Sequence, residues 1–248
     1  MGPKRRTPLL VAVFMLLGMI GCSGKDHSAA KASPPAPSET RTDKPAGDPG
    51  QFPSHPDREF DLRGSAEAWE LPAAASVGAD GLTLAVAAKT EATSAAAPVT
   101  VEPGPAGVMV EADIVLPHEK DSGAGVWCRG DVGLHSGYAF VVGREGGWGV
   151  FRYDSGSPVQ LKRGGIDPSE LEGDAPMRLR LACGKPAGGV AVLGIAYGDA
   201  PFALITDREA PTPSSPTRIG VLVTRVPASS EETKATATHL TFRYAKAP

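Results

Sequence analysis

The chain has 248 residues, a formal net charge of −3, and 41% hydrophobic and 21% charged residues, as an ordinary globular protein does. The slightly negative charge gives no overall attraction to nucleic acid, so we expect no nucleic-acid partner. With 30 Gly and 24 Pro, the sequence favours many turns and a disordered segment over long helices.

The N-terminus has the features of an export signal. Residues 4–6 are basic, and Leu9–Ile20 is an apolar run that is shorter than the roughly 20 residues of a membrane span but typical of a signal peptide. The ending Met19–Cys22 resembles the lipobox of bacterial lipoproteins, although Met stands where Leu is usual. This resemblance implies a signal peptide over residues 1–21 and a lipidated (palmitate-bearing) Cys22 that anchors the protein to the outer leaflet of the cell membrane. An ordinary signal peptide with an incidental cysteine is the alternative, and the export route stays open.

Residues 22–58 contain almost no large apolar side chain and are rich in Ala, Pro, Ser, Lys, Asp and Gly. Such a segment cannot bury enough surface to offset the entropy lost on ordering. We expect a disordered linker that holds the folded domain away from the membrane. The folded domain is expected over residues 59–248.

The rest of the chain is predicted to form short strands. Between Gly123 and Arg163, apolar runs alternate with clusters of Gly, Asp and Ser, which indicates an antiparallel meander. The strands expected in chain order are Phe60–Leu62, Leu82–Val86, Gly107–Leu116, Ala124–Arg129, Tyr138–Val142, Gly147–Tyr153, Pro158–Lys162, Ala175–Cys183, Gly189–Tyr197, Phe202–Thr206, Thr217–Thr224 and Thr236–Tyr244. One helical turn is expected at Asp167–Leu171. This pattern predicts an all-β fold, a two-sheet antiparallel sandwich or jelly roll.

The cysteines favour a disulfide. If Cys22 carries lipid, Cys128 and Cys183 remain as an even pair in an oxidising compartment. Their bond would close a loop of about 55 residues and contribute roughly 4 kcal/mol of stability. Neither a metal site nor a catalytic thiol is indicated, because no His or Cys residues lie near the two cysteines at a recognisable spacing.

A disulfide inside the sandwich also predicts a recognition surface. With both cysteines pointing inward, the period of two places Trp127, Arg129, Arg178 and Arg180 on the opposite face. If their strands are adjacent, these side chains form one surface. Arg binds carboxylate or phosphate in a bidentate fork, and Trp is a flat platform for a sugar ring or peptide. The alternative is that Arg129 pairs with a nearby carboxylate and Trp127 covers an edge.

Trp148 and Arg152 are the second pair of candidate ligand contacts, because they share one face of a predicted strand. Aromatic residues at a period of two are more often part of a sandwich core. That alternative applies to Tyr138, Phe140 and Trp148.

Several spaced motifs resemble one family. These motifs are Val108–Ile114, Gly123–Arg129, Ser136–Val141, Trp148–Arg152, Leu161 and Met177–Cys183. They look like a concanavalin A-like jelly-roll domain, and the resemblance covers about Glu59–Tyr244. Such domains occur in lectins, glucanases, laminin-G-like modules and the extracellular parts of lipoproteins from high-GC Gram-positive bacteria. The resemblance implies the two-sheet fold but not the activity, because the family includes binders and hydrolases.

The retaining glucanases of this family carry a motif Glu-x-Asp-x-x-Glu, with two carboxylates roughly 5–5.5 Å apart. Here Glu111 and Asp113 are followed by Leu116 at the place of the second Glu, so we expect no enzyme. The aspartates of the predicted loops lack the spacing of a calcium-binding loop, and we expect neither a metal nor a cofactor.

The sequence therefore predicts a lipid-anchored, extracellular, non-catalytic binding module. A saccharide or cell-wall polymer is the favoured ligand. A protein–protein adaptor on the cell surface and a glycoside hydrolase-like enzyme of the same fold are the alternatives.

Overall fold

The computed structural model describes residues 58–87, 90–98, 107–171, 173–184, 190–210, 217–225 and 232–244. The predicted signal peptide, the lipidated Cys22 and the linker up to residue 57 lie outside these residues. Within the described ranges, no helix has both the length and the apolar character of a membrane span.

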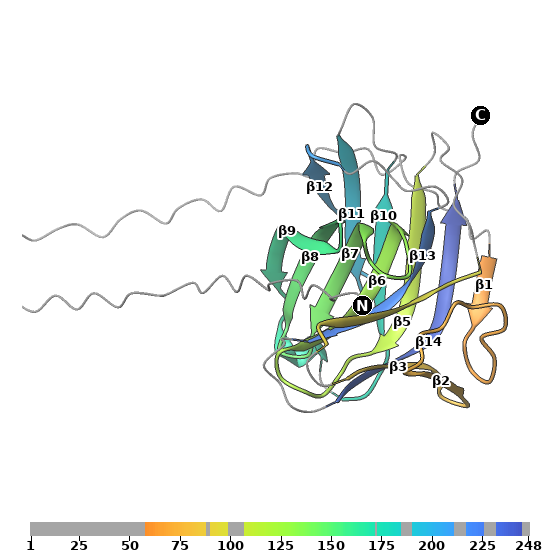
Figure 1. Cartoon of the computed structure of the whole chain (residues 1–248). Coiled ribbons are helices and arrows are strands. Elements are labelled where there is room, and N and C mark those ends of the chain that lie inside the picture. The colour runs from red at the N-terminus through yellow and green to blue at the C-terminus, as the bar shows by residue number, and fades with distance from the viewer. Residues whose placement is uncertain are drawn as a thin grey trace, which may run out of the picture. The chain divides into compact units, whose positions relative to one another are not determined.

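The described strands form two antiparallel sheets that stack on one another (Figure 1). In spatial order, the eight-stranded sheet contains β12 (Ala203–Asp207), β11 (Ala191–Tyr197), β10 (Met177–Cys183), β5 (Val108–Val115), β14 (Thr233–Tyr244), β3 (Gly81–Val86) and β2 (Ala75–Gly78), and β1 (Arg58–Asp61) pairs with β14 beside this path. The six-stranded sheet contains β4 (Ala92–Ala96), β13 (Arg218–Arg225), β6 (Ser122–Gly130), β7 (Ser136–Gly143), β8 (Gly147–Asp154) and β9 (Ser157–Gly165). The predicted two-sheet sandwich is confirmed.

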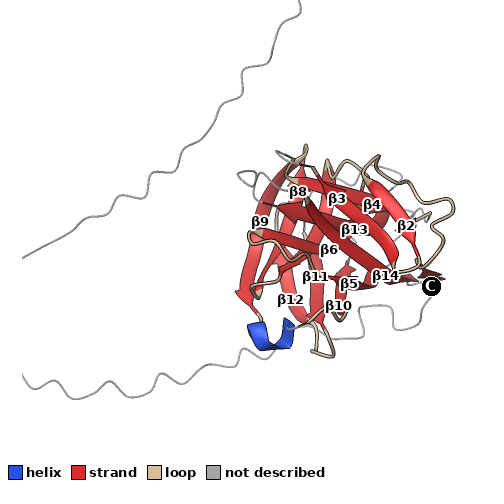
Figure 2. Cartoon of the chain, turned by 90° about the horizontal axis from the view of Figure 1, so that it is seen from below, coloured by secondary structure: helices blue, strands red, loops and turns tan. Residues whose placement is uncertain are grey.

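The predicted helical turn is also present, as a 3₁₀ turn, η2 (Pro168–Leu171), between β9 and β10 (Figure 2). Asp167 caps this turn, since its carboxylate accepts hydrogen bonds from the backbone nitrogen and the hydroxyl of Ser169. These bonds lower the pKa of Asp167.

Two strands, β2 and β4, are not predicted by the sequence. β4 reads ATSAA and β2 reads ASVG, so neither has the run of β-branched and aromatic residues that marks a strand. Tertiary pairing creates both strands: β4 pairs with β13, and β2 pairs with β3.

The main core lies between the sheets and follows the alternation of the strands. On β5, Val108, Val110, Ala112 and Ile114 are buried against the opposite sheet, whereas the residues between them lie on the outer face. The same alternation on β6 and β10 directs both cysteines into the core.

The disulfide Cys128–Cys183 is formed, as predicted, and it connects β6 of one sheet to β10 of the other with a Cα–Cα distance of 6.5 Å. Because the two cysteines point toward each other from facing sheets, the residues beside them point in opposite directions. Trp127 and Arg178 therefore belong to opposite outer faces of the sandwich. The predicted common surface of tryptophan and arginine side chains is wrong, because it required β6 and β10 to be neighbours in one sheet.

Candidate functional site

The outer face of the six-stranded sheet is hollowed into a continuous trough. Two hollows of about 530 and 420 Å³ lie on this face. They share Val141, Phe151, Thr224 and Arg225, so they join in the middle of the sheet. We call this combined depression the trough, its larger part the first hollow and its smaller part the second hollow.

Glycines form much of the floor of the second hollow. Gly123 of β6, Gly143 of β7, and Gly147 and Gly149 of β8 all line it. A glycine on the outer face leaves a gap where another residue would place a side chain. The second hollow extends from β13 to β9, which is four inter-strand steps or roughly 19 Å. It is therefore an elongated site rather than a point contact.

Phe151 supplies the apolar surface at the centre of the trough. Its side chain is half-buried and lines both hollows. The ring lies over Gly149, where an added Cβ would come within 2.7 Å of two ring carbons. Farther along the same strand, Tyr153 lines the first hollow, and burial raises the pKa of its hydroxyl, with a further contribution from the charge of Glu91. An aromatic ring flanked by open space is a surface on which an apolar ligand face can stack.

Hydroxyl, amide and charged groups line the trough around this ring. In the first hollow these residues are Thr90, Glu91, Thr93, Ser94, Thr224 and Arg225. In the second hollow they are Glu119, Asp121, Ser122, Arg144, Glu145, Gln160, Arg163, Thr224 and Arg225. A trough with a central aromatic ring and polar groups along its length can stack on one face of a ligand and form hydrogen bonds at its edges.

Trp127, a candidate from the sequence, does not reach the surface. Its exposed fraction is 0%, and its indole nitrogen donates a hydrogen bond to the backbone oxygen of Val221 at 3.1 Å. The ring lies against Gly220, where an added Cβ would come within 2.8 Å of it, and packs in an outer apolar cluster with Leu134 and Leu222. The prediction of Trp127 as a ligand platform is wrong, because neighbouring apolar side chains cover the ring.

Arg129 is also buried, with 3% of its surface exposed. The pairing of β6 with β13 shifts at this point, since Cys128 faces Ile219 and Gly130 faces Arg218. Arg129 is thus the extra residue of a β-bulge, and its φ of 52° departs from the strand conformation. Its Nε donates to the backbone oxygen of Cys183 at 3.3 Å. The bulge removes Arg129 from the predicted surface, so its assignment as a ligand contact is wrong.

Arg152 belongs to a buried ionic network between the sheets. Its Nη1 donates to Oδ1 of Asp207 at 2.9 Å and its Nη2 to Oε2 of Glu209 at 3.0 Å. The hydroxyl of Tyr138 donates to Oδ2 of Asp207 at 3.0 Å, and burial strongly raises the pKa of this tyrosine. The alternation of β8 points Arg152 inward with Val150, so its prediction as a ligand contact is wrong.

Trp148 is the sequence candidate that lies at the trough. The residue is half-buried and lines the second hollow, while the alternation of β8 directs its side chain toward the core with Val150. The ring meets Phe140 of the core edge-on at a centroid distance of 6.1 Å and lies over Gly164 of β9. The Trp148 ring is therefore held by the core and by β9, and the residue borders the trough only at this edge.

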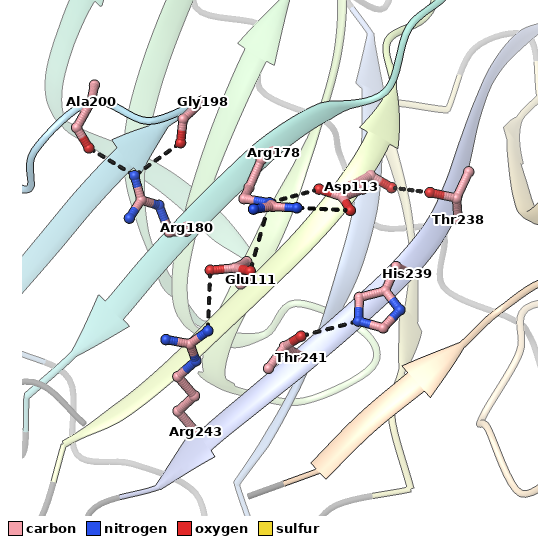
Figure 3. Close-up of polar contacts among 10 residues, drawn as sticks. All are labelled: Glu111, Asp113, Arg178, Arg180, Gly198, Ala200, Thr238, His239, Thr241 and Arg243. Carbon is pink, nitrogen blue, oxygen red and sulfur yellow. Dashed lines mark hydrogen bonds and ion pairs between the residues drawn. The ribbon is translucent and has the colours of Figure 1, made fainter. Parts of the chain in front are cut away.

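Arg178 and Arg180 lie on the outer face of the eight-stranded sheet (Figure 3). Arg178 pairs with Asp113 at 3.0 Å and with Glu111 at 3.7 Å. Arg180 donates to the backbone oxygens of Gly198 and Ala200. These two arginines are engaged with their own sheet and lie on the opposite side of the molecule from the trough.

Figure 3 also shows the two carboxylates of the incomplete glucanase motif. Glu111 lies between Arg178 and Arg243, at 3.7 and 3.6 Å, and Asp113 pairs with Arg178. Leu116, at the place of the missing carboxylate, is buried. A hollow of about 460 Å³ is lined by Asp113 and Arg178 and also by Glu170 and Asp199, two acids that lie outside the Glu-x-Asp-x-x-Glu spacing of the glucanase motif. Groups of three or more His, Cys, Asp or Glu side chains that could hold a metal ion are not found in the described part of the chain.

The trough residues Phe151, Gln160 and Arg163 are not candidates in the sequence analysis. A signal for the trough does exist there, because β8 alternates Gly147, Gly149 and Phe151 on one face. A strand face with glycines beside an aromatic residue is a surface that can be hollow. Glycine is also the commonest turn residue, so its abundance in this sequence does not by itself indicate a hollow strand face.

These features define a β-sandwich with an elongated trough on one outer face, and comparison with solved structures identifies its fold. The carbohydrate-binding module CBM66 from Bacillus subtilis aligns with a TM-score of 0.50 and 14% identity over 71% of this chain and 95% of that chain. The apo Crh5 transglycosylase aligns with a TM-score of 0.53 and 10% identity over 76% and 84% of the two chains. Lectin I-B4 from Griffonia simplicifolia, in its metal-free form, aligns with a TM-score of 0.50 and 10% identity over 76% and 100%.

The protein thus has the concanavalin A-like jelly-roll fold that its sequence motifs predict. The sequence matches no family model. A comparison with curated proteins finds no match either. Because the structural likeness includes binding modules and a transglycosylase at low identity, it establishes the fold and leaves the activity to the site.

Proposed function

We propose that this protein is a saccharide-binding module and that the trough is its binding site. The observation that carries the proposal is the trough itself, with its glycine floor, its central Phe151 and its polar lining on the outer face of the six-stranded sheet. Sugar rings have an apolar face and a rim of hydroxyl groups. They therefore match a surface that offers an aromatic ring beside Thr, Ser, Gln, Glu and Arg side chains.

The structural neighbours support the same class of ligand. A carbohydrate-binding module and a lectin share the fold of this chain over most of their own length. A protein-binding adaptor is a weaker alternative, because it would favour a flat apolar patch. The large hydrophobic side chains exposed among the described residues are Leu71, Val159 and Val190, which belong to different segments.

We further propose that binding occurs without catalysis. A glycosidase needs two carboxyl groups that face each other across the scissile bond. The carboxylates Glu111 and Asp113 are paired with arginine side chains on the sheet opposite the trough. Measurable turnover of a bound oligosaccharide that disappears in Glu111→Gln would contradict this part of the proposal.

From the sequence of the export signal, we propose that the protein is a lipoprotein anchored through Cys22. The lipid would hold it on the outer leaflet, with the domain exposed outside the cell. Cys22→Ser is expected to abolish metabolic labelling with palmitate and to release the protein into the medium. Retention of label in this variant would show that the lipid is not attached at Cys22.

Filling the trough is expected to abolish saccharide binding. Gly147 lines the second hollow, and an added Cβ at this position meets no atom within 4 Å, so Gly147→Leu is chosen to add bulk to the trough. Gly78→Leu is the matched control, since Gly78 also has open space around it but belongs to β2 of the other sheet. The measurement is binding of both variants and the wild type to a glycan array, followed by titration with the saccharide retained.

We expect Gly147→Leu to lose at least tenfold in affinity, while Gly78→Leu binds like the wild type. Equal binding by all three proteins would contradict the placement of the site. Absence of any bound saccharide on the array would contradict the proposed function.

A further inference from the structure

The β9 side of the trough presents a cation directly beside the apolar centre. In the pairing of β8 with β9, Gln160 faces Phe151 and Arg163 faces Gly149. Both β9 residues are exposed and line the second hollow. Gly149 has no side chain of its own and the Phe151 ring lies over it, so Arg163 is placed beside this ring at the β9 edge of the trough.

Two of the other charged residues that line the second hollow, both in the turn between β7 and β8, pair with residues outside it. Glu145 lies 3.6 Å from Lys120, and Arg144 pairs with Asp174 at 3.0 Å. Glu119 is engaged only weakly: it is the smallest contributor to the raised pKa of Lys234, which pairs with Glu232 at 2.8 Å, and its Oε2 is buried without a hydrogen bond in the described part of the chain.

Two charged residues of the lining belong to the opposite end of the hollow. Asp121 immediately precedes β6, and Arg225 of β13 pairs with Ser122 in the β6–β13 ladder. In the described ranges, the Arg163 side chain takes part in no ion pair or hydrogen bond. The β9 side of the trough therefore carries an available guanidinium group.

Resting on the proposed function, we propose that the saccharide is an anionic one and that Arg163 binds its carboxylate or phosphate group. The sugar ring stacks on Phe151, and Gln160 and Arg163 contact the substituents that project toward β9. The guanidinium fork matches the planar oxygens of a carboxylate and also the oxygens of a phosphate. A charge-assisted hydrogen bond of this kind is strong enough to select an acidic saccharide over its neutral counterpart.

The test is an array that carries acidic saccharides beside neutral counterparts with the same backbone. One arm pairs polygalacturonate with its methyl ester, and the other pairs phosphorylated mannan with mannan. The wild type, Arg163→Gln, Arg163→Lys and Lys162→Gln are compared at low and physiological salt. Lys162→Gln is the matched control, because Lys162 is exposed on the same strand but does not line the trough.

We expect the wild type to bind the acidic member of at least one pair about tenfold more tightly than the neutral member. Arg163→Gln should remove this preference and leave the neutral saccharide unaffected, Arg163→Lys should retain part of it, and Lys162→Gln should retain it fully. The inference would be overturned if the wild type bound the acidic and neutral members of each pair with equal affinity. It would also be overturned if Arg163→Gln and Lys162→Gln lost the preference for the acidic member equally. Either result would leave saccharide binding in place. If the wild type bound none of the saccharides, both this inference and the proposed function would be overturned.

Discussion

Arg152→Leu is expected to lower the free energy of unfolding by about 3–5 kcal/mol, because it leaves a buried carboxylate without its counter-ion. Asp207 is 3% exposed and accepts hydrogen bonds from Arg152, from the hydroxyl of Tyr138 and from the backbone nitrogen of Glu209. The remaining donors are neutral, so they cannot replace the guanidinium charge. Urea denaturation at neutral pH measures the change.

Two companion variants distinguish this cause from a general loss of packing. Arg178→Leu removes an exposed arginine that also pairs with a carboxylate, and it should cost at most about 1 kcal/mol. The double variant Arg152→Leu with Asp207→Leu removes both buried charges, and it should be more stable than Arg152→Leu alone. A cost below about 1 kcal/mol for Arg152→Leu would show that the network does not stabilise the sandwich as described.

Removing the disulfide by Cys128→Ala with Cys183→Ala is expected to lower the free energy of unfolding by about 4 kcal/mol. The bond joins residues 55 positions apart and connects the two sheets, so its loss allows the unfolded chain many more conformations. The measurement is again the urea unfolding curve, with the wild type and the double variant compared with and without a reducing agent. Equal curves for the two proteins without reductant would contradict this contribution.

The fold could be predicted largely because strand alternation and turn residues are local signals. The inward set of β5, for example, follows directly from its period of two. The partners of each strand are not local. The pairing of β10 with β5 and β11, rather than with β6, determined that Arg178 lies far from Trp127.

The candidate site was predicted poorly for reasons that individual residues make clear. Arg129 changes direction at a bulge that depends on the register of β13, which the sequence of β6 alone does not contain. Trp127 has the expected outward direction, but Leu134 and Leu222 cover it. Phe151 is the aromatic residue that lines both hollows, and Gly149 beside it on β8 has no side chain to cover it. An outward-pointing side chain is thus a weaker candidate for ligand contact than an outward-pointing side chain that has glycine beside it.

The most direct test of the central claim is a map of the amide chemical shifts during titration with the saccharide that the array identifies. We predict that the shifts change along the trough, at Gly123, Gly143, Gly147, Gly149 and Phe151, and stay constant at Glu111 and Arg178 on the opposite sheet. Changes centred on Glu111 and Arg178, with none along the trough, would contradict the account.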